Sequence, residues 1–336
     1  MSTYSIGKLP SADLARLLGK YAAADPRLVV GGAVGQDAAV IDLGDRYLVA
    51  KTDPITFATA EIGWYAVNVN ANDIACAGAT PRWFLATLLL PEKGSTPALV
   101  EEIFAQIHEA CTNLGISLVG GHTEITYGLD RPLVIGQMLG EVAPDRLVTT
   151  SGAQVGDDLI LTKGIAIEAT AIIAVEMRSE LLERFDEDTL DRYGNMLHDP
   201  GISVVKDAVA ATAAGAVHAM HDPTEGGVAT GLHELAEAAG VGLEIKAESL
   251  PYLPETVALC QCFDLDPLGV IASGALLIAA DPESTAAILT NLTQAGIDAA
   301  VIGRVQPPDA GRILVEKQVS RPLPAFARDE ITRLFE

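Results

Sequence analysis

The chain has 336 residues, of which 49% are hydrophobic and 20% are charged, a composition typical of a folded globular protein. Its 45 acidic and 22 basic residues give a formal net charge of -23, and no Lys/Arg cluster offers the basic footprint that nucleic acid requires. No uninterrupted apolar run reaches the length of about 18 residues that a membrane span needs. We therefore expect a cytoplasmic protein that binds neither nucleic acid nor a membrane.

The predicted elements of the first half alternate between strands and helices. They are an amphipathic helix near 14–21, strands at 38–43 and 47–50, a turn at 52–54, a helix at about 60–77, a strand at 84–90, a helix at 96–115, and strands at 116–119 and 133–142. The helix at 60–77 has no charged residue between Glu61 and Asp73, and its apolar residues lie on all sides. That pattern predicts a buried helix.

The second half begins after the Ser/Thr/Gly-rich segment 144–156, so we expect domains at 1–148 and 149–336. Its predicted elements are strands at 158–162, 216–220, 243–246, 275–280 and 299–305, with helices at 203–214, 228–239 and 283–295. Cys260 and Cys262 lie on one side of a segment that we expect to be extended, without the second ligand pair of a structural zinc site. Both halves are predicted to be α+β.

Asp73 is the carboxylate that the predicted buried helix carries inward. An ionised carboxylate removed from water costs several kcal/mol unless a cation or several donors meet it. We therefore expect a positive group to face Asp73, with Asn70 one turn earlier on the same side of the helix. The alternative is a structural aspartate that accepts bonds from a neighbouring loop. Asp53 precedes Pro54, which disfavours a helix there, so we expect Asp53 at a strand end.

Several carboxylates follow glycine-rich turns or end strands, and they are Asp37, Asp53, Asp73, Glu124 and Asp222. Together such groups would hold two or three Mg²⁺ ions against a polyphosphate, because hard divalent cations prefer oxygen ligands. Gly120 and Gly121 precede His122, Thr123 and Glu124, and we expect a loop there that lets the backbone approach a ligand. His122 is either a ligand or acid/base group, or a hydrogen-bonded loop residue.

Motifs along residues 30–305 resemble the aminoimidazole ribonucleotide (AIR) synthetase superfamily. In chain order they read GQDAAVIDL, KTDPITF, VNVNANDIACAGATPRWF, LVGGHTEIT, GDDLILTKGI and HDPTEGGVATGLHELAEAAGVGLEI. The superfamily also includes thiamine monophosphate kinase, selenophosphate synthetase and the hydrogenase-maturation branch HypE. The motifs are most similar to those of the HypE branch.

The resemblance implies an α+β, two-domain PurM-like fold. The N-terminal sheets of two subunits would pair into a β-barrel, so that the protein is a homodimer, and the C-terminal half would form an α/β sandwich. ATP and Mg²⁺ would bind between the halves. The γ-phosphate would pass to an oxygen of a small molecule, or of an acyl or carboxamide group on a partner.

The resemblance also assigns roles to residues of this chain. Catalytic roles fall on Asp53, Asp73 and His122; nucleotide contacts on Asp37, Lys51, Asn70, Gly120, Gly121 and Thr123; and metal binding on Asp37, Asp53, Asp73, Glu124 and Asp222. Lys51 is the candidate for a phosphate oxygen, or else a solvated lysine.

The sequence departs from the HypE pattern at three places. It ends Arg333-Leu334-Phe335-Glu336, where a cysteine would carry a carbamoyl group. Glu225 stands where the motif usually has arginine, and His122 stands where that branch has aspartate, a role that Glu124 would take over. We therefore expect a phosphotransferase related to HypE. The alternatives are a thiamine monophosphate kinase, or a nucleotide-binding regulatory dimer without catalysis.

Overall fold

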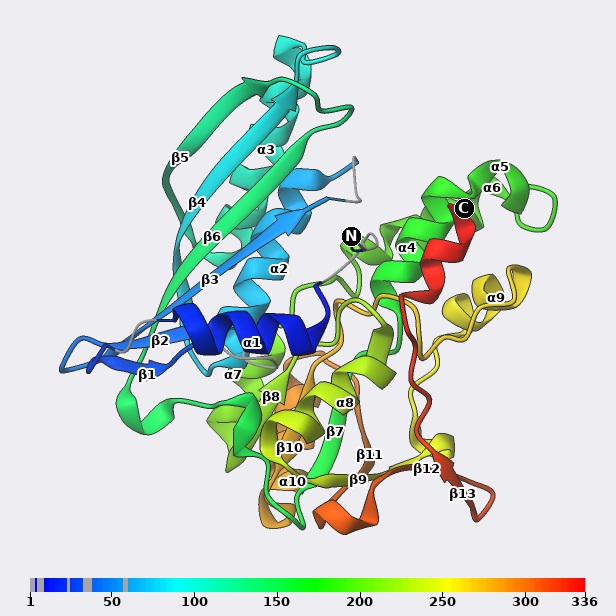
Figure 1. Cartoon of the computed structure of the whole chain (residues 1–336). Helices are drawn as coiled ribbons and strands as arrows, with labels where there is room; N and C mark the ends of the chain where they lie inside the picture. The colour runs from blue at the N-terminus through cyan, green and yellow to red at the C-terminus, as the bar shows by residue number, and fades with distance from the viewer. Residues whose placement is uncertain (1–3, 5–8, 23–24, 33–37, 57–59, 336) are drawn as a thin grey trace. The chain divides into compact units, whose positions relative to one another are not determined.

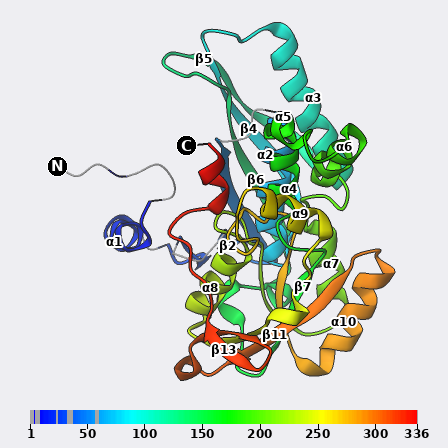
Figure 2. The ribbon, with the colours of Figure 1, turned by 90° about the vertical axis from the view of Figure 1, so that its right-hand side faces the viewer.

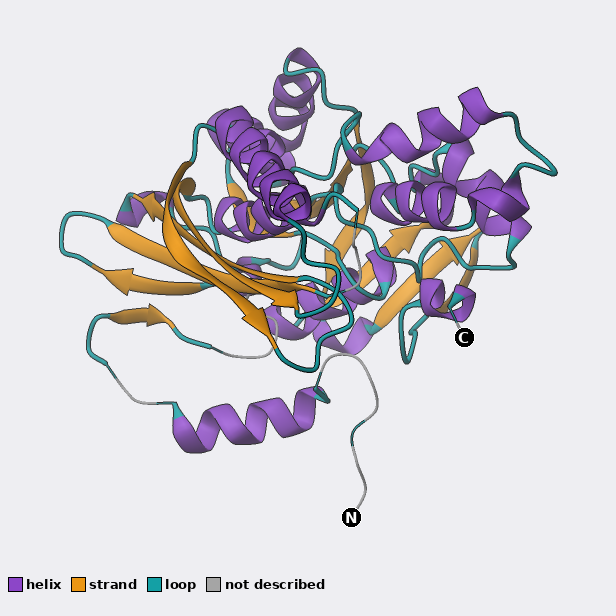
Figure 3. Ribbon diagram, turned by 90° about the horizontal axis from the view of Figure 1, so that it is seen from above, coloured by secondary structure: helices purple, strands orange, loops and turns teal. Residues whose placement is uncertain are grey.

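The computed structural model describes residues 4, 9–22, 25–32, 38–56 and 60–335 (Figure 1). Residues 25–32 and 38–147 form one compact unit, the N-terminal unit, whereas 9–22 and 148–335 form the other, the C-terminal unit. Each contains one sheet and helices, which confirms the α+β class (Figure 3). Among the described residues, no helix has the length and apolar character needed to cross a membrane.

The N-terminal unit is built on a six-stranded sheet in the order β1-β2-β3-β6-β4-β5. Its elements are β1 (Leu28–Val30), β2 (Ala39–Asp42), β3 (Tyr47–Ile55), α2 (Ile62–Cys76), β4 (Thr80–Pro91), α3 (Pro97–Leu114), β5 (Ser117–Thr126) and β6 (Leu133–Val142). β4 and β5 are parallel, and the other neighbouring strands are antiparallel. Helix α2 packs on β3, β4 and β6, with α3 against it.

Helix α2 is buried along nearly its whole length, as its apolar sequence predicts. It can lie this close to the sheet because β6 presents glycines to it. A Cβ at Gly136 would lie 2.3 Å from Asn70 Nδ2, and one at Gly140 would lie 2.3 Å from Ile74 Cγ2. The backbone of β6 therefore determines how near Asn70, and with it the polar side of α2, comes to the sheet.

Strand β3 continues through Asp53 and Pro54 to Ile55, so the turn predicted at 52–54 is wrong. Among the described residues, β2 pairs only with 47–50 of β3, and Pro54 lies in the part of β3 that pairs with β6 alone. Proline is tolerated where a strand has one partner, because its missing N–H interrupts no ladder on the open side.

The loop predicted at Gly120–Thr123 is also wrong, because these residues lie within β5. The register between β4 and β5 shifts between Phe84 and Leu85, where β5 has one extra residue, Val119, directly before the two glycines. A Cβ at Gly121 would lie 1.9 Å from the Ala86 carbonyl oxygen. Glycine at 121 is therefore required by strand packing.

The C-terminal unit is built on a seven-stranded sheet in the order β13-β12-β9-β11-β7-β10-β8. Its strands are β7 (Asp158–Thr162), β8 (Val217–His221), β9 (Gly242–Lys246), β10 (Leu277–Ala280), β11 (Ala299–Gln306), β12 (Arg312–Glu316) and β13 (Val319–Pro322). Its helices are α1 (Ser11–Tyr21), α4 (Ile167–Glu176), α5 (Arg178–Leu181), α6 (Glu187–Gly194), α7 (Val205–Ala214), α8 (Gly227–Ala239), α9 (Pro254–Cys262) and α10 (Pro282–Gln294), with the short 3-10 helix η6 (Glu330–Leu334).

Helices α7 and α10 lie side by side in this unit (Figure 2). The extended segment predicted around Cys260 and Cys262 is wrong, because both residues belong to helix α9. Pro254 occupies the first turn of α9, where its fixed φ and missing N–H favour a helix start. This proline was the signal for a helix in the sequence.

Candidate functional site

Three charged side chains from β3 and α2 meet in the N-terminal unit. Lys51 Nζ lies 3.2 Å from Asp73 Oδ2 and 3.3 Å from Asp53 Oδ2. Lys51 and Asp53 are two residues apart on β3, and alternation along a strand therefore places them on one face. The Asp73 side chain is 6% exposed and that of Lys51 is 16% exposed, whereas that of Asp53 is 36% exposed. Lys51 is thus a positive group facing Asp73, and Asp53 is the more accessible carboxylate.

Asn70 holds the backbone of Asp53 in place. Its Oδ1 accepts the Asp53 N–H at 2.9 Å, and its Nδ2 donates to the Asp53 carbonyl at 3.3 Å and to the Ala66 carbonyl at 2.8 Å. The Asn70 amide thus makes the kind of paired backbone hydrogen bonds that a neighbouring strand would make along the open side of β3. The nucleotide contact predicted for Asn70 stays a prediction, and the observed bonds give this residue a positioning role.

The pair Asp53 and Asp73 matches the donor set of a Mg²⁺ site. Mg²⁺ commonly binds one or two protein carboxylates and takes its remaining ligands from water and substrate phosphates. The ammonium of Lys51 already lies between the two carboxylates, in the place of a cation. Among the described residues, no group of three or more His, Cys, Asp or Glu residues could hold a metal alone, and Asp37 lies outside those residues.

The other predicted residues of this unit lie on β5, which is exposed along nearly its whole length. His122 Nε2 lies 3.3 Å from Glu124 Oε2, and Thr126 Oγ1 donates to Glu124 Oε1 at 3.3 Å. The structure therefore pairs His122 with Glu124 on one face of an exposed strand. Gly120 and Thr123 are exposed neighbours on that strand, and their contact with a nucleotide stays a prediction.

Asp222 belongs to the C-terminal unit, which is described separately from Asp53 and Asp73. It follows β8 directly and is buried, at 3% exposure. The preceding residue, His221, is also buried, and its Nε2 lies 2.9 Å from Glu234 Oε2 on α8. The metal role predicted for Asp222 stays a prediction.

A second cluster of carboxylates, in the C-terminal unit, was not predicted from the sequence. Glu168 lies in the first turn of α4 and is 5% exposed, and no described residue bonds to its buried Oε2. Burial is the main cause that raises the pKa of Glu168 to about 7, against a lowering bond from Ser273, while Asp329 and Glu225 raise it further. A lone acid within the apolar segment Ile167–Ala174 was the available signal, the same that identified Asp73 in α2.

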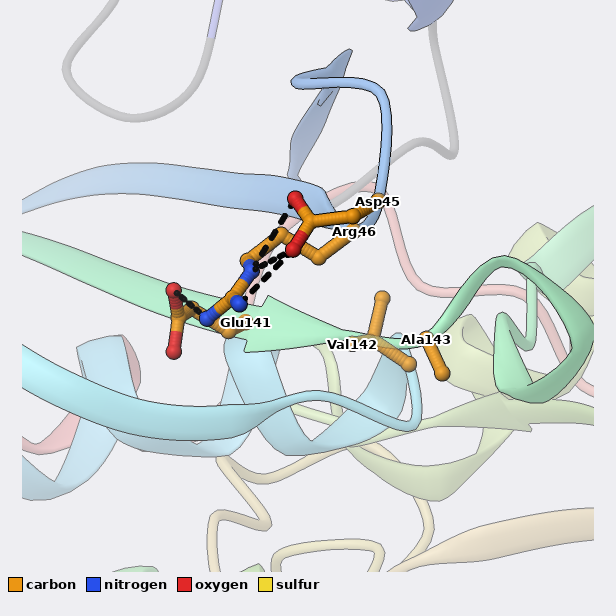
Figure 4. Close-up of a pocket in the computed structure, with 5 residues that line it drawn as sticks. All are labelled: Asp45, Arg46, Glu141, Val142 and Ala143. Atoms are coloured by element: carbon orange, nitrogen blue, oxygen red, sulfur yellow. Dashed lines mark hydrogen bonds and ion pairs between the residues drawn. The ribbon is translucent and has the colours of Figure 1, made fainter.

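A shallow pocket of about 280 Å³ lies near the β2–β3 turn and the end of β6 (Figure 4). Its charged lining is formed by Arg46, which binds Asp45 Oδ2 at 2.9 Å and Glu141 Oε1 at 3.1 Å. The bond from Arg46 lowers the pKa of Asp45. Because the guanidinium already binds two carboxylates of its own chain, we assign no ligand to this pocket.

Two family models match the chain. AIR synthase related protein, N-terminal domain, matches residues 35–142, and AIR synthase related protein, C-terminal domain, matches residues 154–316. A carbamoyl dehydratase HypE from Rhizobium leguminosarum bv. viciae is 32% identical over 287 residues, covering 82% of this chain and 78% of the relative. A selenide, water dikinase from Pelobacter propionicus is 29% identical over 349 residues, covering 92% of this chain and 94% of the relative.

A solved structure, that of hydrogenase maturation protein HypE in complex with ATP, has the same fold. Its TM-score is 0.73 at 23% identity, and the match covers 98% of this chain and 98% of that chain. The PurM-like fold expected from the motifs is therefore confirmed for the single chain. Pairing of two subunits into a barrel stays a prediction.

We expect Lys51→Met to destabilise the N-terminal unit by about 3 kcal/mol, because it leaves the buried Asp73 carboxylate without this cation. Urea unfolding followed by tryptophan fluorescence measures this, since Trp64 and Trp83 are the two tryptophans of the sequence and both belong to this unit. The matched control is Lys93→Met, which removes an exposed lysine. Equal stability of the two variants would contradict the assigned role of Lys51.

Glu168→Gln should stabilise the protein in a pH-dependent way. The folded pKa of about 7 lies above the usual 4.5, so the folded state binds the extra proton and loses stability as pH rises between those values. Removing the ionisable group should then raise the free energy of unfolding by about 3 kcal/mol at pH 8 but only about 1 kcal/mol at pH 5. Urea unfolding followed by circular dichroism measures both values. Glu176→Gln, at the exposed end of α4, is the control and should show no such difference.

Proposed function

The chain belongs to the AIR synthase-related family, and from this membership we propose that it is a Mg²⁺-dependent, ATP-using enzyme that transfers the γ-phosphate to an oxygen atom of an acceptor. The observation that carries the proposal is the cluster of Lys51, Asp53 and Asp73, in which two carboxylates and one ammonium meet. Phosphoryl transfer depends on positioning and charge neutralisation, and this cluster supplies groups for both.

The three residues have different roles in this proposal. Asp53 and Asp73 would hold Mg²⁺, which would neutralise phosphate charge. Asp53 is the more exposed carboxylate and reaches the ligand, while Asp73 is fixed within α2. Lys51, beside both carboxylates, would supply a positive charge to a phosphate oxygen. Asp37 and Asp222 stay proposed metal ligands. The metal role proposed for Glu124 and the acid/base role proposed for His122 beside it belong to β5, which β6 and β4 separate from β3.

The acceptor is a small molecule or a carboxamide or acyl group borne by a partner. The name carbamoyl dehydratase describes a relative that acts on a carbamoyl group, and the name selenide, water dikinase describes one that phosphorylates small inorganic acceptors. The ATP complex of a protein with the same fold supports the choice of nucleotide. The domain ranges 1–148 and 149–336 and a place in the cytoplasm stay part of the proposal.

The exposed strand β5 supports a homodimer. It is an edge strand, and nine consecutive residues of it are exposed, so both faces are open. Val119 is 52% and Ile125 is 56% exposed, and Tyr127 beyond the strand end is 88% exposed. An exposed edge strand of this length that carries large apolar side chains is a surface that proteins normally cover. We propose that a second copy of the chain covers it.

The first test is calorimetric titration of the protein with ATP, with and without Mg²⁺. Binding should require Mg²⁺, and Asp53→Asn should weaken it at least tenfold, because one of the two carboxylates in the Lys51 cluster is lost. Asp130→Asn, which removes an exposed acid of the same unit, should bind as the unaltered protein does. Equal binding by both variants would overturn the proposed site.

Catalysis itself is measured as ADP formation with a panel of amides, carboxylates and phosphate monoesters. ADP release that depends on an added acceptor, and that Asp53→Asn abolishes, would support the enzyme. Tight Mg²⁺-ATP binding with no transfer to any acceptor would favour the alternative, a nucleotide-binding regulatory dimer.

Substituting Asp for Val119 or Ile125 should convert the dimer to monomers, because a charge would then be buried in the proposed interface. Sedimentation velocity at several protein concentrations measures the change. The control is Val319→Asp, which introduces the same charge at an exposed position on β13. If all three variants sediment as the unaltered protein does, β5 is not the interface.

A further inference from the structure

The turn between β8 and α8 carries Asp222 and spans residues 222–227. Part of it is held by the neighbouring segment 268–272. The Ala272 N–H donates to the Thr224 carbonyl at 3.2 Å, and a Cβ at Gly227 would lie 2.4 Å from the Leu268 carbonyl oxygen. The turn is therefore packed against a fixed surface on one side.

A carboxylate from the C-terminal segment binds the same turn. Asp329 Oδ2 accepts the Gly226 N–H at 2.7 Å, a contact between residues 103 positions apart in the sequence. Its Oδ1 accepts the Ile331 N–H at 2.9 Å, and the backbone of Ile271 also donates to this side chain. One carboxylate thus joins the turn, the 268–272 segment and the start of η6.

This contact is electrostatically expensive, which separates it from an incidental surface bond. Asp329 is 9% exposed, and burial raises its pKa, although the N–H donors oppose that rise. Glu225 also raises the pKa of Asp329, and both acids raise that of the buried Glu168. The carboxylate is kept beside two other acids, at the one place where it meets the Gly226 N–H.

The bond also falls on a backbone group that controls the turn. Gly226 has φ +79 and precedes the first residue of α8, so its peptide directs both the start of the helix and the chain leading back to Asp222. The Gly227 N–H bonds to the Thr224 carbonyl at 3.0 Å, which leaves the Gly226 N–H pointing out of the turn and available to Asp329. By holding the Gly226 N–H, Asp329 restrains the conformation of the turn.

We propose that Asp329 is a positioning residue for the reaction, which holds the 222–227 turn so that Asp222 is presented in its working orientation. The inference rests on the proposed function for its catalytic consequence, whereas its structural part stands on the bonds of Asp329 alone. The segment that contains η6 thereby becomes part of the functional machinery of the C-terminal unit.

The test compares Asp329→Asn with Glu330→Gln in the full-length protein. An asparagine presents one acceptor oxygen and one NH₂ group to backbone N–H donors, so it cannot keep all of the bonds that the carboxylate makes. Glu330→Gln alters the next residue, whose carboxylate binds Arg333 at 2.8 Å and not the turn. Asp329→Glu is the conservative variant. It keeps the charge and should therefore show a smaller effect than Asp329→Asn.

Amide hydrogen exchange of the peptide containing 222–230 gives a readout that needs no catalysis. It should quicken at least tenfold in Asp329→Asn and stay unchanged in Glu330→Gln. Under the proposed reaction, Asp329→Asn should lower kcat about 10- to 100-fold with KM for ATP changed less than threefold, because misplacement of a catalytic group affects the transition state most.

The outcomes separate this inference from the proposed function. Unchanged exchange at 222–230 in Asp329→Asn overturns the inference, whatever the activity. Quickened exchange with unchanged kcat overturns the catalytic part and leaves a purely structural contact. An unaltered protein without ATP turnover refutes the proposed function, and exchange then still decides whether Asp329 holds the turn. If Asp329→Asn does not fold, the same comparison with Asp329→Glu decides.

Discussion

The ion contact between Asp73 and Lys51 is the interaction on which the N-terminal unit depends. Helix α2 has apolar residues on all sides and is buried between the sheet and α3, so its one carboxylate has to be matched inside the protein. The matching positive charge is Lys51 on β3, and this contact fixes how α2 lies along that strand. Asn70 and Gly136 also determine how closely α2 approaches the sheet. Asn70 bonds to β3, and Gly136 leaves room on β6.

The two units accommodate their buried acidic side chains in different ways. Asp73 remains beside a resident cation, whereas Glu168 has no such partner among the described residues and is held by Ser273 with a raised pKa. A positive partner stabilises the ionised form of the first carboxylate. The second can carry a proton near neutrality, and this difference follows from what the neighbouring elements place opposite each helix.

The sequence allowed the main elements and the Asp73 environment to be predicted, because periodicity and isolated charges are local signals. Helix α2 and strands β6 and β7 were predicted almost to the residue. The path of β3 through Pro54 and of β5 through Gly121 could not be foreseen. Each depends on which strands lie alongside, and a bulge that admits glycine looks like a loop when the partner strand is unknown. The bond from Asp329 to Gly226 spans too much of the chain for any local pattern to reveal it.

The ammonium of Lys51 is tethered to β3 and compensates one of the two negative charges that meet between β3 and α2. A counter-charge of Asp73 is thus part of the chain itself. Under the proposed function, a divalent ion between Asp53 and Asp73 would have to exchange with this tethered cation. The lysine would then remain within a side chain's length of the ion.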